Sequence, residues 1–180
     1  MKRKIFISLN IPERDRKRLA RLAEKWHNLP IKWTKEANLH ITLAFLGFVL
    51  ESDLPEICQK VALAARKSTI FDLEFDEISL FPSAEEPRAV ALIGRPSEEL
   101  KTLVNDLEAE LGISYAPRKS FRAHVTLGRV RKNKWAGLET EPRILEKFAI
   151  NLPVDTVDIM ASDFDGEEGE YVVLESCPLV

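Results

Sequence analysis

The sequence has 180 residues, of which 45% are hydrophobic, enough for one globular domain or for two tightly joined lobes. Its formal net charge of −3 argues against a protein that coats nucleic acid through a broad basic surface. No apolar run reaches the ~18–20 residues needed to span a bilayer. The basic start, Met1–Lys4, precedes an apolar run that breaks at Asn10 and Pro12, so we expect no export signal.

The two cysteines, Cys58 and Cys177, form no C-x-x-C motif. Isolated cysteines in a chain of this length are typical of reduced intracellular thiols, and nothing in the sequence pairs them. We therefore expect a soluble cytoplasmic protein without a membrane partner.

Hydrophobic periodicity predicts alternating strands and helices in the first half of the chain. In order, we expect a strand over residues 5–9, a helix over 12–28, strands over 31–33 and 39–45, and a helix from Ser52 or Asp53 to Ala65. Gly47 is expected to end the strand over 39–45.

The second half continues with strands over 71–81 and 89–93, joined by a polar loop over 83–88. A helix over 97–111, capped by Ser97 and ended by Gly112, leads to a strand over 122–130. A short helix over 142–149 and a hairpin of strands 154–160 and 171–174, turning around residues 165–169, complete the chain. This pattern predicts an α+β protein in which residues 1–180 form a single domain of two lobes.

The unit His-x-Thr-Leu occurs twice inside apolar runs, as His40-Ile41-Thr42-Leu43 and as His124-Val125-Thr126-Leu127. Side chains two apart in a strand share a face, so each histidine should project together with its threonine while the intervening residues enter a core. Two of the three histidines of the chain lie in this arrangement.

The repeat extends beyond the two motifs, which lie 84 residues apart. At the same offset and without a gap, the strand over 5–9 falls on the strand over 89–93, and Leu19 falls on Leu103. Self-similarity of this kind is typical of a duplicated unit. We expect a bilobal, pseudo-two-fold fold with antiparallel-rich sheets, outer helices and a central cleft that receives one His-x-Thr strand from each lobe.

A basic segment surrounds the second motif. Residues 111–138 contain no Asp or Glu but seven basic residues: Arg118, Lys119, Arg122, Arg129, Arg131, Lys132 and Lys134. On an otherwise acidic chain, this distribution indicates a local anion site, although a solvated charge run near a loop would look the same.

Two facing imidazoles suit a reaction that needs an acid and a base together, because histidine with a pKa near ~6.5 can serve as either at neutral pH. Each threonine adds a hydroxyl that can donate to an oxyanion. The sequence has no G-x-S-x-G motif and no cysteine beside either histidine, which favours a phosphoester over a carbonyl substrate. A cyclic phosphodiester fits best, since water attacks phosphorus while a ribose oxygen leaves.

The paired motifs resemble those of the two-histidine phosphoesterase superfamily and, within it, the LigT-type RNA 2′,3′-cyclic phosphodiesterases, which are also 2′-5′ RNA ligase-like. The resemblance covers nearly the whole chain and includes Phe6-Ile7-Ser8-Leu9, Trp33, Asn38-Leu39-His40, Phe45-Leu46-Gly47, Phe81-Pro82, Phe121-Arg122 and Tyr171. It implies hydrolysis of a 2′,3′-cyclic phosphate to a 2′-phosphate without metal or cofactor. It also implies RNA ends or small cyclic nucleotides as ligands, a ligase-like activity on 2′–5′ linkages in some members, and a monomer.

By the same resemblance, His40 is the general acid, His124 is the general base, and Thr42 and Thr126 hold the non-bridging oxygens. The residues alone leave open which histidine is the acid.

The resemblance further implies that Phe45 stacks on a nucleobase and that Arg129 contacts phosphate. Strict alternation would instead turn both side chains toward the core, so we expect a bulge or twist near Gly128 to bring Arg129 outward. Arg122 shares the parity of His124 and is the alternative phosphate ligand.

Two other functions compete with this interpretation. A metal-dependent phosphoesterase is disfavoured because no carboxylate lies at ligand spacing from either histidine. A non-catalytic module that binds RNA ends would show binding without turnover.

Overall fold

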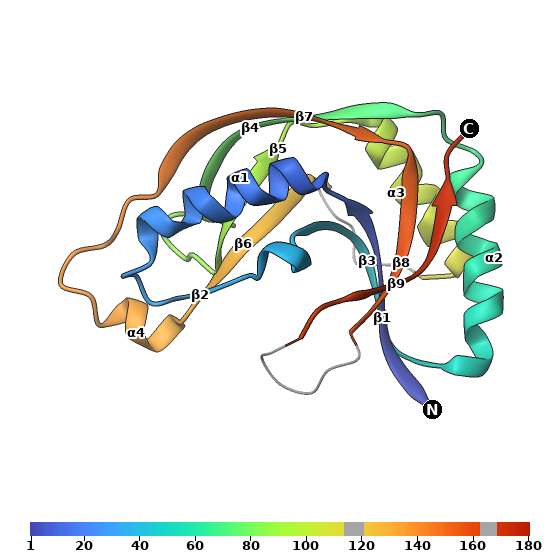
Figure 1. The fold of residues 1–180 in the computed structure, drawn as a ribbon, viewed down its shortest axis with the longest axis horizontal. Coiled ribbons are helices and arrows are strands. Elements are labelled where there is room, and N and C mark those ends of the chain that lie inside the picture. The colour runs from blue at the N-terminus through green and yellow to red at the C-terminus, as the bar shows by residue number, and fades with distance from the viewer. Residues whose placement is uncertain (114–120, 163–168) are drawn as a thin grey trace.

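The computed structural model describes residues 1–113, 121–162 and 169–180 (Figure 1). Its strands are β1 (Lys2–Asn10), β2 (Ile31–Trp33), β3 (His40–Leu50), β4 (Phe71–Phe81), β5 (Ala89–Gly94), β6 (His124–Val130), β7 (Leu145–Val154), β8 (Thr156–Ser162) and β9 (Val172–Pro178). Its helices are α1 (Glu13–Ala23), α2 (Leu54–Ala65), α3 (Glu98–Leu111) and α4 (Lys132–Ala136), with single 3-10 turns at Glu24–Trp26, Glu36–Asn38 and Glu51–Asp53.

The strands of the described residues form one antiparallel sheet in the order β7-β4-β5-β6-β3-β1-β8-β9, with β2 paired to β6. The order is symmetric about its centre, where β6 and β3, the two histidine strands, are neighbours. The next strand outward on each side is the first strand of the same repeat, β5 beside β6 and β1 beside β3. The α+β class and the pseudo-two-fold antiparallel arrangement are therefore confirmed, although the two halves join into a continuous sheet.

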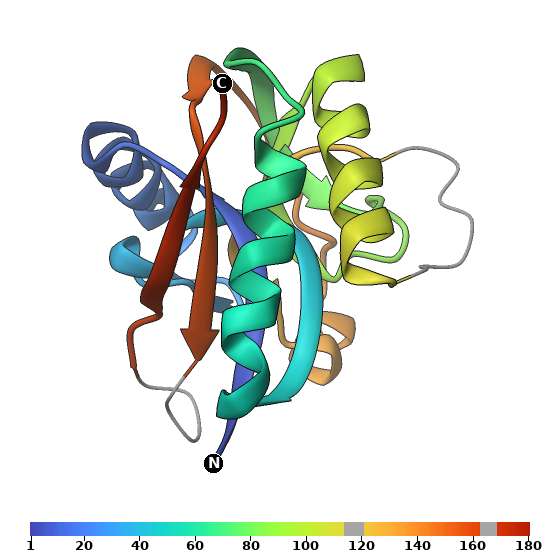
Figure 2. The same ribbon diagram turned by 90° about the vertical axis from the view of Figure 1, so that its right-hand side faces the viewer.

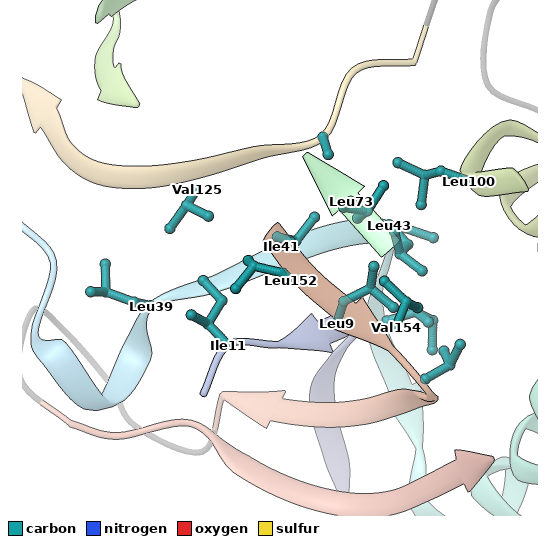
Figure 3. Packing of buried hydrophobic residues seen from close by; sticks show 14 of the residues in the cluster. Leu9, Ile11, Leu39, Ile41, Leu43, Leu73, Leu100, Val125, Leu152 and Val154 are labelled. Atoms are coloured by element: carbon teal, nitrogen blue, oxygen red, sulfur yellow. The ribbon is translucent and has the colours of Figure 1, made fainter. Parts of the chain in front are cut away.

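The helices cover the face of the sheet opposite the histidines. On that face Ile5, Ile7 and Leu9 of β1 are almost completely buried, as are Ile41 and Val125 beside the two histidines. They belong to one apolar cluster, part of which is drawn in Figure 3 with Leu9, Ile41 and Val125 labelled. The cluster also includes buried residues of α1, α2 and α3.

The three long helices are shared between the two halves of the sheet. Helix α1 follows β1 but contacts β6 of the other half, and α3 follows β5 but contacts β3. Helices α2 and α3 lie side by side, with β8 and β9 next to α2 (Figure 2). This exchange ties the two halves into one core. No helix in the described part of the chain is long and apolar enough to cross a membrane.

The predicted capping residues of helix α3, Ser97 and Gly112, are both confirmed. The Ser97 hydroxyl accepts from the Leu100 N–H at 3.1 Å, and Gly112 ends the helix in the left-handed conformation at φ 64°. Both caps follow the ordinary rules for helix ends.

Three element predictions were wrong. Residues 142–149 were expected to form a helix but enter β7, which pairs with β4 along the edge of the sheet. The inward-facing residues of β7 alternate as a strand requires: Phe148, Ile150, Leu152 and Val154. The predicted helix ended at residue 149, so most of this alternation lay beyond the segment on which the prediction was based. Strand β3 also continues through Gly47 to Leu50, and the short helix α4 was not expected.

Two expectations concern residues outside the described ranges. Arg118 and Lys119 of the basic segment lie there, as do most residues of the expected turn at 165–169. The flanking strands β8 and β9 do pair antiparallel, as a hairpin requires.

The ungapped 84-residue offset is also wrong for the first strand of each repeat. Phe6 pairs with Phe45 in one half, and Ala89 pairs with Arg129 in the other. The structural equivalent of Phe6 is therefore Ala89, and β1 and β5 lie one residue out of step with the histidine strands. This shift changes which side chains stand beside the histidines.

Candidate active site

His40 and His124 begin the two central strands, which are joined at the pair Ile41–Val125. Because the strands are antiparallel, His40 lies toward Thr126 and His124 lies toward Thr42. The four residues share one side of the sheet, which we call the histidine face. The sequence prediction that both His-x-Thr units come together is confirmed in this sense, while their roles stay predictions.

Both imidazoles are held in the same way through Nδ1. His40 Nδ1 lies 2.6 Å from the Asn38 carbonyl oxygen, and His124 Nδ1 lies 3.2 Å from the Arg122 carbonyl oxygen. A carbonyl only accepts, so Nδ1 carries the hydrogen in each ring and Nε2 is left for chemistry. His40 Nε2 lies 2.8 Å from the Thr42 hydroxyl oxygen, which donates to the neutral ring.

The surroundings lower the pKa of both histidines. For each, burial is the largest cause because it penalises the charged ring, and the hydrogen bond to the backbone carbonyl opposes it. The positive charge of Arg129 lowers the pKa of both, and the charge of His124 further lowers that of His40. Both rings are therefore neutral at neutral pH in the free protein, and Arg129 lies within electrostatic reach of both.

A β-bulge turns Phe45 and Arg129 onto the histidine face. Pairing passes from Ser8–Thr42 to Ile7–Ala44 on β3 and from Ala91–Thr126 to Val90–Gly128 on β6, so one leucine is left over on each strand. The extra residue reverses the alternation. The first seven residues of both strands consequently show the same order of burial, with Phe45 and Arg129 exposed. The expected bulge near Gly128 is present, and it has a twin in β3.

The bulge on β6 also depends on a close backbone approach. A Cβ added to Gly128 would lie 2.5 Å from Ile31 Cγ2 and 2.9 Å from Trp33 Cε3, two residues of β2, which pairs with β6 at this point. This contact positions Lys32, which pairs with Arg129 and so faces the same way. Lys32 and Arg129 therefore place two positive charges next to each other on the histidine face.

The other half of the histidine face is aromatic. The ring of Phe6 lies 5.0 Å from His40 and 6.2 Å from Phe45, and Tyr171 meets His40 edge-on at 5.3 Å. Phe6 and Tyr171 therefore both pack against the ring of His40. The register shift explains the asymmetry, since the equivalent of Phe6 is the small Ala89 beside Arg129.

His124 has an aromatic neighbour from a different strand. Phe81 of β4 pairs with Ala89, and its ring stacks on His124 at 4.5 Å with 20° between the planes.

Asn38 fastens the C-terminal region to the site. Its side chain is buried, donates through Nδ2 to the Gly169 carbonyl oxygen and accepts through Oδ1 from the Tyr171 N–H, both at 2.9 Å. Its own carbonyl oxygen accepts from His40. One residue thus orients His40 and holds Tyr171 against it.

Arg122 makes a different contact from the one predicted. Its guanidinium donates through Nε and Nη2 to the Gly94 carbonyl oxygen, at 3.3 and 3.1 Å. The backbone carbonyl of Arg122 accepts from His124, so Arg122 helps to orient this ring. Arg129 is the arginine whose charge lowers the pKa of both histidines.

Sequence reasoning missed the site roles of Phe6, Asn38, Phe81 and Tyr171, although each belongs to a segment that carried the resemblance. Lys32 had no signal beyond its place in a short strand. Among the described residues, no group of three or more His, Cys, Asp or Glu is arranged to hold a metal ion.

Comparison with known proteins places this geometry in a family. The family model for LigT-like phosphoesterases matches residues 9–91. The RNA 2′,3′-cyclic phosphodiesterase of Thermotoga maritima is 28% identical over 179 residues, covering 96% of this chain and 93% of that relative. The one from Aeropyrum pernix is 34% identical over 119 residues, covering 63% of this chain and 66% of that relative.

Solved structures share the fold along the whole chain. A protein of Thermus thermophilus superposes with a TM-score of 0.80 at 24% identity, covering 98% of this chain and 97% of that one. Escherichia coli LigT in complex with ATP gives a TM-score of 0.75 at 24% identity, covering 99% of both chains. The fold shared with LigT, the family match over the first histidine strand and the curated relatives agree: this chain belongs to the LigT-like phosphoesterase family.

Proposed function

We propose that this protein hydrolyses RNA or nucleotide 2′,3′-cyclic phosphates to 2′-phosphates by metal-independent catalysis with His40 and His124. The observation that carries the proposal is the mirrored pair of imidazoles on adjacent strands, each anchored through Nδ1. The relatives named RNA 2′,3′-cyclic phosphodiesterase support this substrate class. Escherichia coli LigT, solved with 3′-AMP, supports a nucleotide ligand.

His124 is the general base. Its lowered pKa keeps Nε2 unprotonated at neutral pH, and the nearby Arg129 charge favours that state. As the water oxygen attacks phosphorus, Nε2 of His124 takes the water proton.

His40 is the general acid. The bond between phosphorus and the ribose 3′ oxygen breaks, and that oxygen takes a proton from Nε2 of His40, leaving a 2′-phosphate. The free ring is neutral, but an anionic phosphate bound beside it favours the imidazolium, so the substrate itself raises the pKa of the acid. The leaving oxygen belongs to the sugar next to the base, and His40 lies on the aromatic half where a base would stack.

The remaining residues stabilise charge and orient the substrate. Protonated Nε2 of His40 no longer accepts from Thr42, so in the complex Thr42 and Thr126 both donate hydroxyl hydrogens to the non-bridging oxygens. Arg129 neutralises the charge that grows on the phosphorane-like state. Phe45, 58% exposed beside Phe6, offers a ring to the terminal base.

The same steps allow ligation. If a ribose 5′-hydroxyl takes the place of water, His124 removes its proton and the product is a 2′–5′ linkage; the reverse of this step breaks such a linkage.

The test is to incubate a short RNA ending in a 2′,3′-cyclic phosphate with the protein in EDTA and to separate the 2′- from the 3′-phosphate product. We expect the 2′-phosphate, and a loss of ~100- to 10,000-fold in kcat for His40→Asn and for His124→Asn. His27→Asn is the matched control, because this histidine contacts the Glu24 carbonyl oxygen after α1 and has no place in the site.

Three outcomes contradict the proposal. Full activity in either site variant removes the acid–base pair. Activity abolished by EDTA and restored by a metal ion indicates a metal-dependent phosphoesterase. Binding of the RNA end without turnover indicates a binding module.

A further inference from the structure

An exposed aromatic side chain lies on β3 beyond the proposed site. Phe48 is 74% exposed, more than Phe45 at 58%, and is the most exposed phenylalanine in the described part of the chain. Exposing a large apolar ring in water is unfavourable, and contiguous patches of this kind mark binding surfaces. The chemistry proposed for the terminal phosphate gives Phe48 no role.

A second bulge in β3 turns Phe48 onto the histidine face. Phe45 pairs with Phe6 and Gly47 pairs with Ile5, so Leu46 is the extra residue, and Gly47 has the positive φ of 72° that suits glycine. Without the bulge, positions 45 and 48 would point to opposite sides. With it, Phe48 pairs with Lys4 on the side of Phe6 and Phe45, whereas Leu46 and Val49 pack against the core.

Two lysines of β1 lie near this ring on the same face of the sheet. Lys4 stands opposite Phe48, and Lys2 stands opposite Leu50 at the next position of the same face. Both lysines are exposed. Along β1 and β3 the histidine face therefore continues from the proposed site as aromatic rings beside ammonium groups, the combination that single-stranded nucleic acid binds through base stacking and phosphate contacts.

We propose, on the basis of the cyclic phosphodiesterase activity proposed above, that Phe48 and Lys4 form a subsite for the nucleotide on the 5′ side of the cyclic phosphate. This is the nucleotide that precedes the one carrying the cyclic phosphate. Its base stacks on Phe48, and the phosphate that joins the two nucleotides lies at Lys4. Phe45 and Phe48 lie opposite Phe6 and Lys4, which are two residues apart on β1, so the two rings are separated by about 7 Å. This is wider than the ~3.4 Å spacing of bases stacked on each other, so each base stacks on a ring of its own. The subsite makes the protein selective for oligonucleotide ends over cyclic mononucleotides.

The experiment measures kcat/KM for a 2′,3′-cyclic mononucleotide and for a dinucleotide ending in a 2′,3′-cyclic phosphate. We expect the wild type to prefer the dinucleotide and Phe48→Ala to reduce that preference about 5- to 150-fold, the range of one base–aromatic stack. Phe48→Trp should restore it. Lys4→Ala should flatten the salt dependence for the dinucleotide, by about 0.7 in the slope of the logarithms.

Matched controls come from the helical side of the molecule. Leu63 on α2 is a large apolar residue with 50% exposure, and Lys101 on α3 is an exposed lysine. Leu63→Ala should keep the wild-type preference for the dinucleotide, and Lys101→Ala should keep the wild-type salt dependence.

A wild type without preference for the dinucleotide overturns the subsite, and so does a Phe48→Ala variant with the wild-type preference. If the wild type hydrolyses neither substrate, the proposed function fails and the subsite is tested by binding. Fluorescence anisotropy of a labelled dinucleotide 2′-phosphate then decides: weaker binding to Phe48→Ala than to Leu63→Ala supports the subsite, and equal binding refutes it.

Discussion

Replacing Asn38 by alanine removes the link between the first histidine strand and the C-terminal region. The side chain is 8% exposed and makes two hydrogen bonds, to the Gly169 carbonyl oxygen and to the Tyr171 N–H, both at 2.9 Å. Each hydrogen bond contributes about 0.5–1.5 kcal/mol net, so Asn38→Ala should lower the free energy of unfolding by about 1–3 kcal/mol. In a chain of this size the melting temperature should fall by about 2–12 °C.

The assay is urea denaturation followed by fluorescence, with kcat/KM measured on the same preparations. Asn38→Asp is the informative companion, because it keeps the acceptor for Tyr171 N–H but loses the donor to Gly169. We expect both variants to lose kcat/KM as well as stability, since Tyr171 then no longer packs firmly against His40. A free energy of unfolding within about 0.5 kcal/mol of the wild type for Asn38→Ala would refute the reasoning, because surface substitutions show effects of that size.

Two further predictions concern the histidines and β2. Because the folded protein lowers the pKa of His40 and His124, their contribution to stability is present above the unfolded value of ~6.5 and is lost as the pH falls through the folded values. Denaturation between pH 5 and 7 should therefore show a flatter pH dependence in the double variant His40→Gln/His124→Gln, and parallel curves would contradict the assigned burial. Gly128→Ala should destabilise the fold by about 1–3 kcal/mol through its collision with β2, visible in the melting temperature and in tryptophan fluorescence from Trp33; an unchanged melting temperature would contradict the close approach.

Local sequence patterns determined most of the secondary structure and the identity of the two histidine strands. Sequence alone reveals the apolar run of β1, the alternation within the His-x-Thr-Leu motifs of β3 and β6, and the caps of α3, because burial and the satisfaction of helix ends depend on neighbours in sequence. The strand period alone predicts that His40 and Thr42 project from the same face, and likewise His124 and Thr126. The duplication also predicted that the two strands would meet.

Tertiary structure decided what stands around the histidines. The bulges that turn Phe45, Phe48 and Arg129 onto the histidine face appear only in the pairing with β1 and β5, since a bulge is defined by a partner strand. The one-residue shift that sets Phe6 against one histidine and Ala89 beside Arg129 has the same origin.

Contacts between segments that are far apart in the chain could not be predicted from local sequence patterns. Residues 145–149 belong to strand β7 because they pair with the edge of β4, and the alternation that marks this strand becomes clear only further along, up to Val154. Asn38 and Tyr171 are 133 residues apart, and the hydrogen bond between them exists only once β8 and β9 have folded beside β1. The sequence by itself determined which residues can do the chemistry; packing across the sheet decided which neighbours tune them, because pKa values and orientation depend on distance in space.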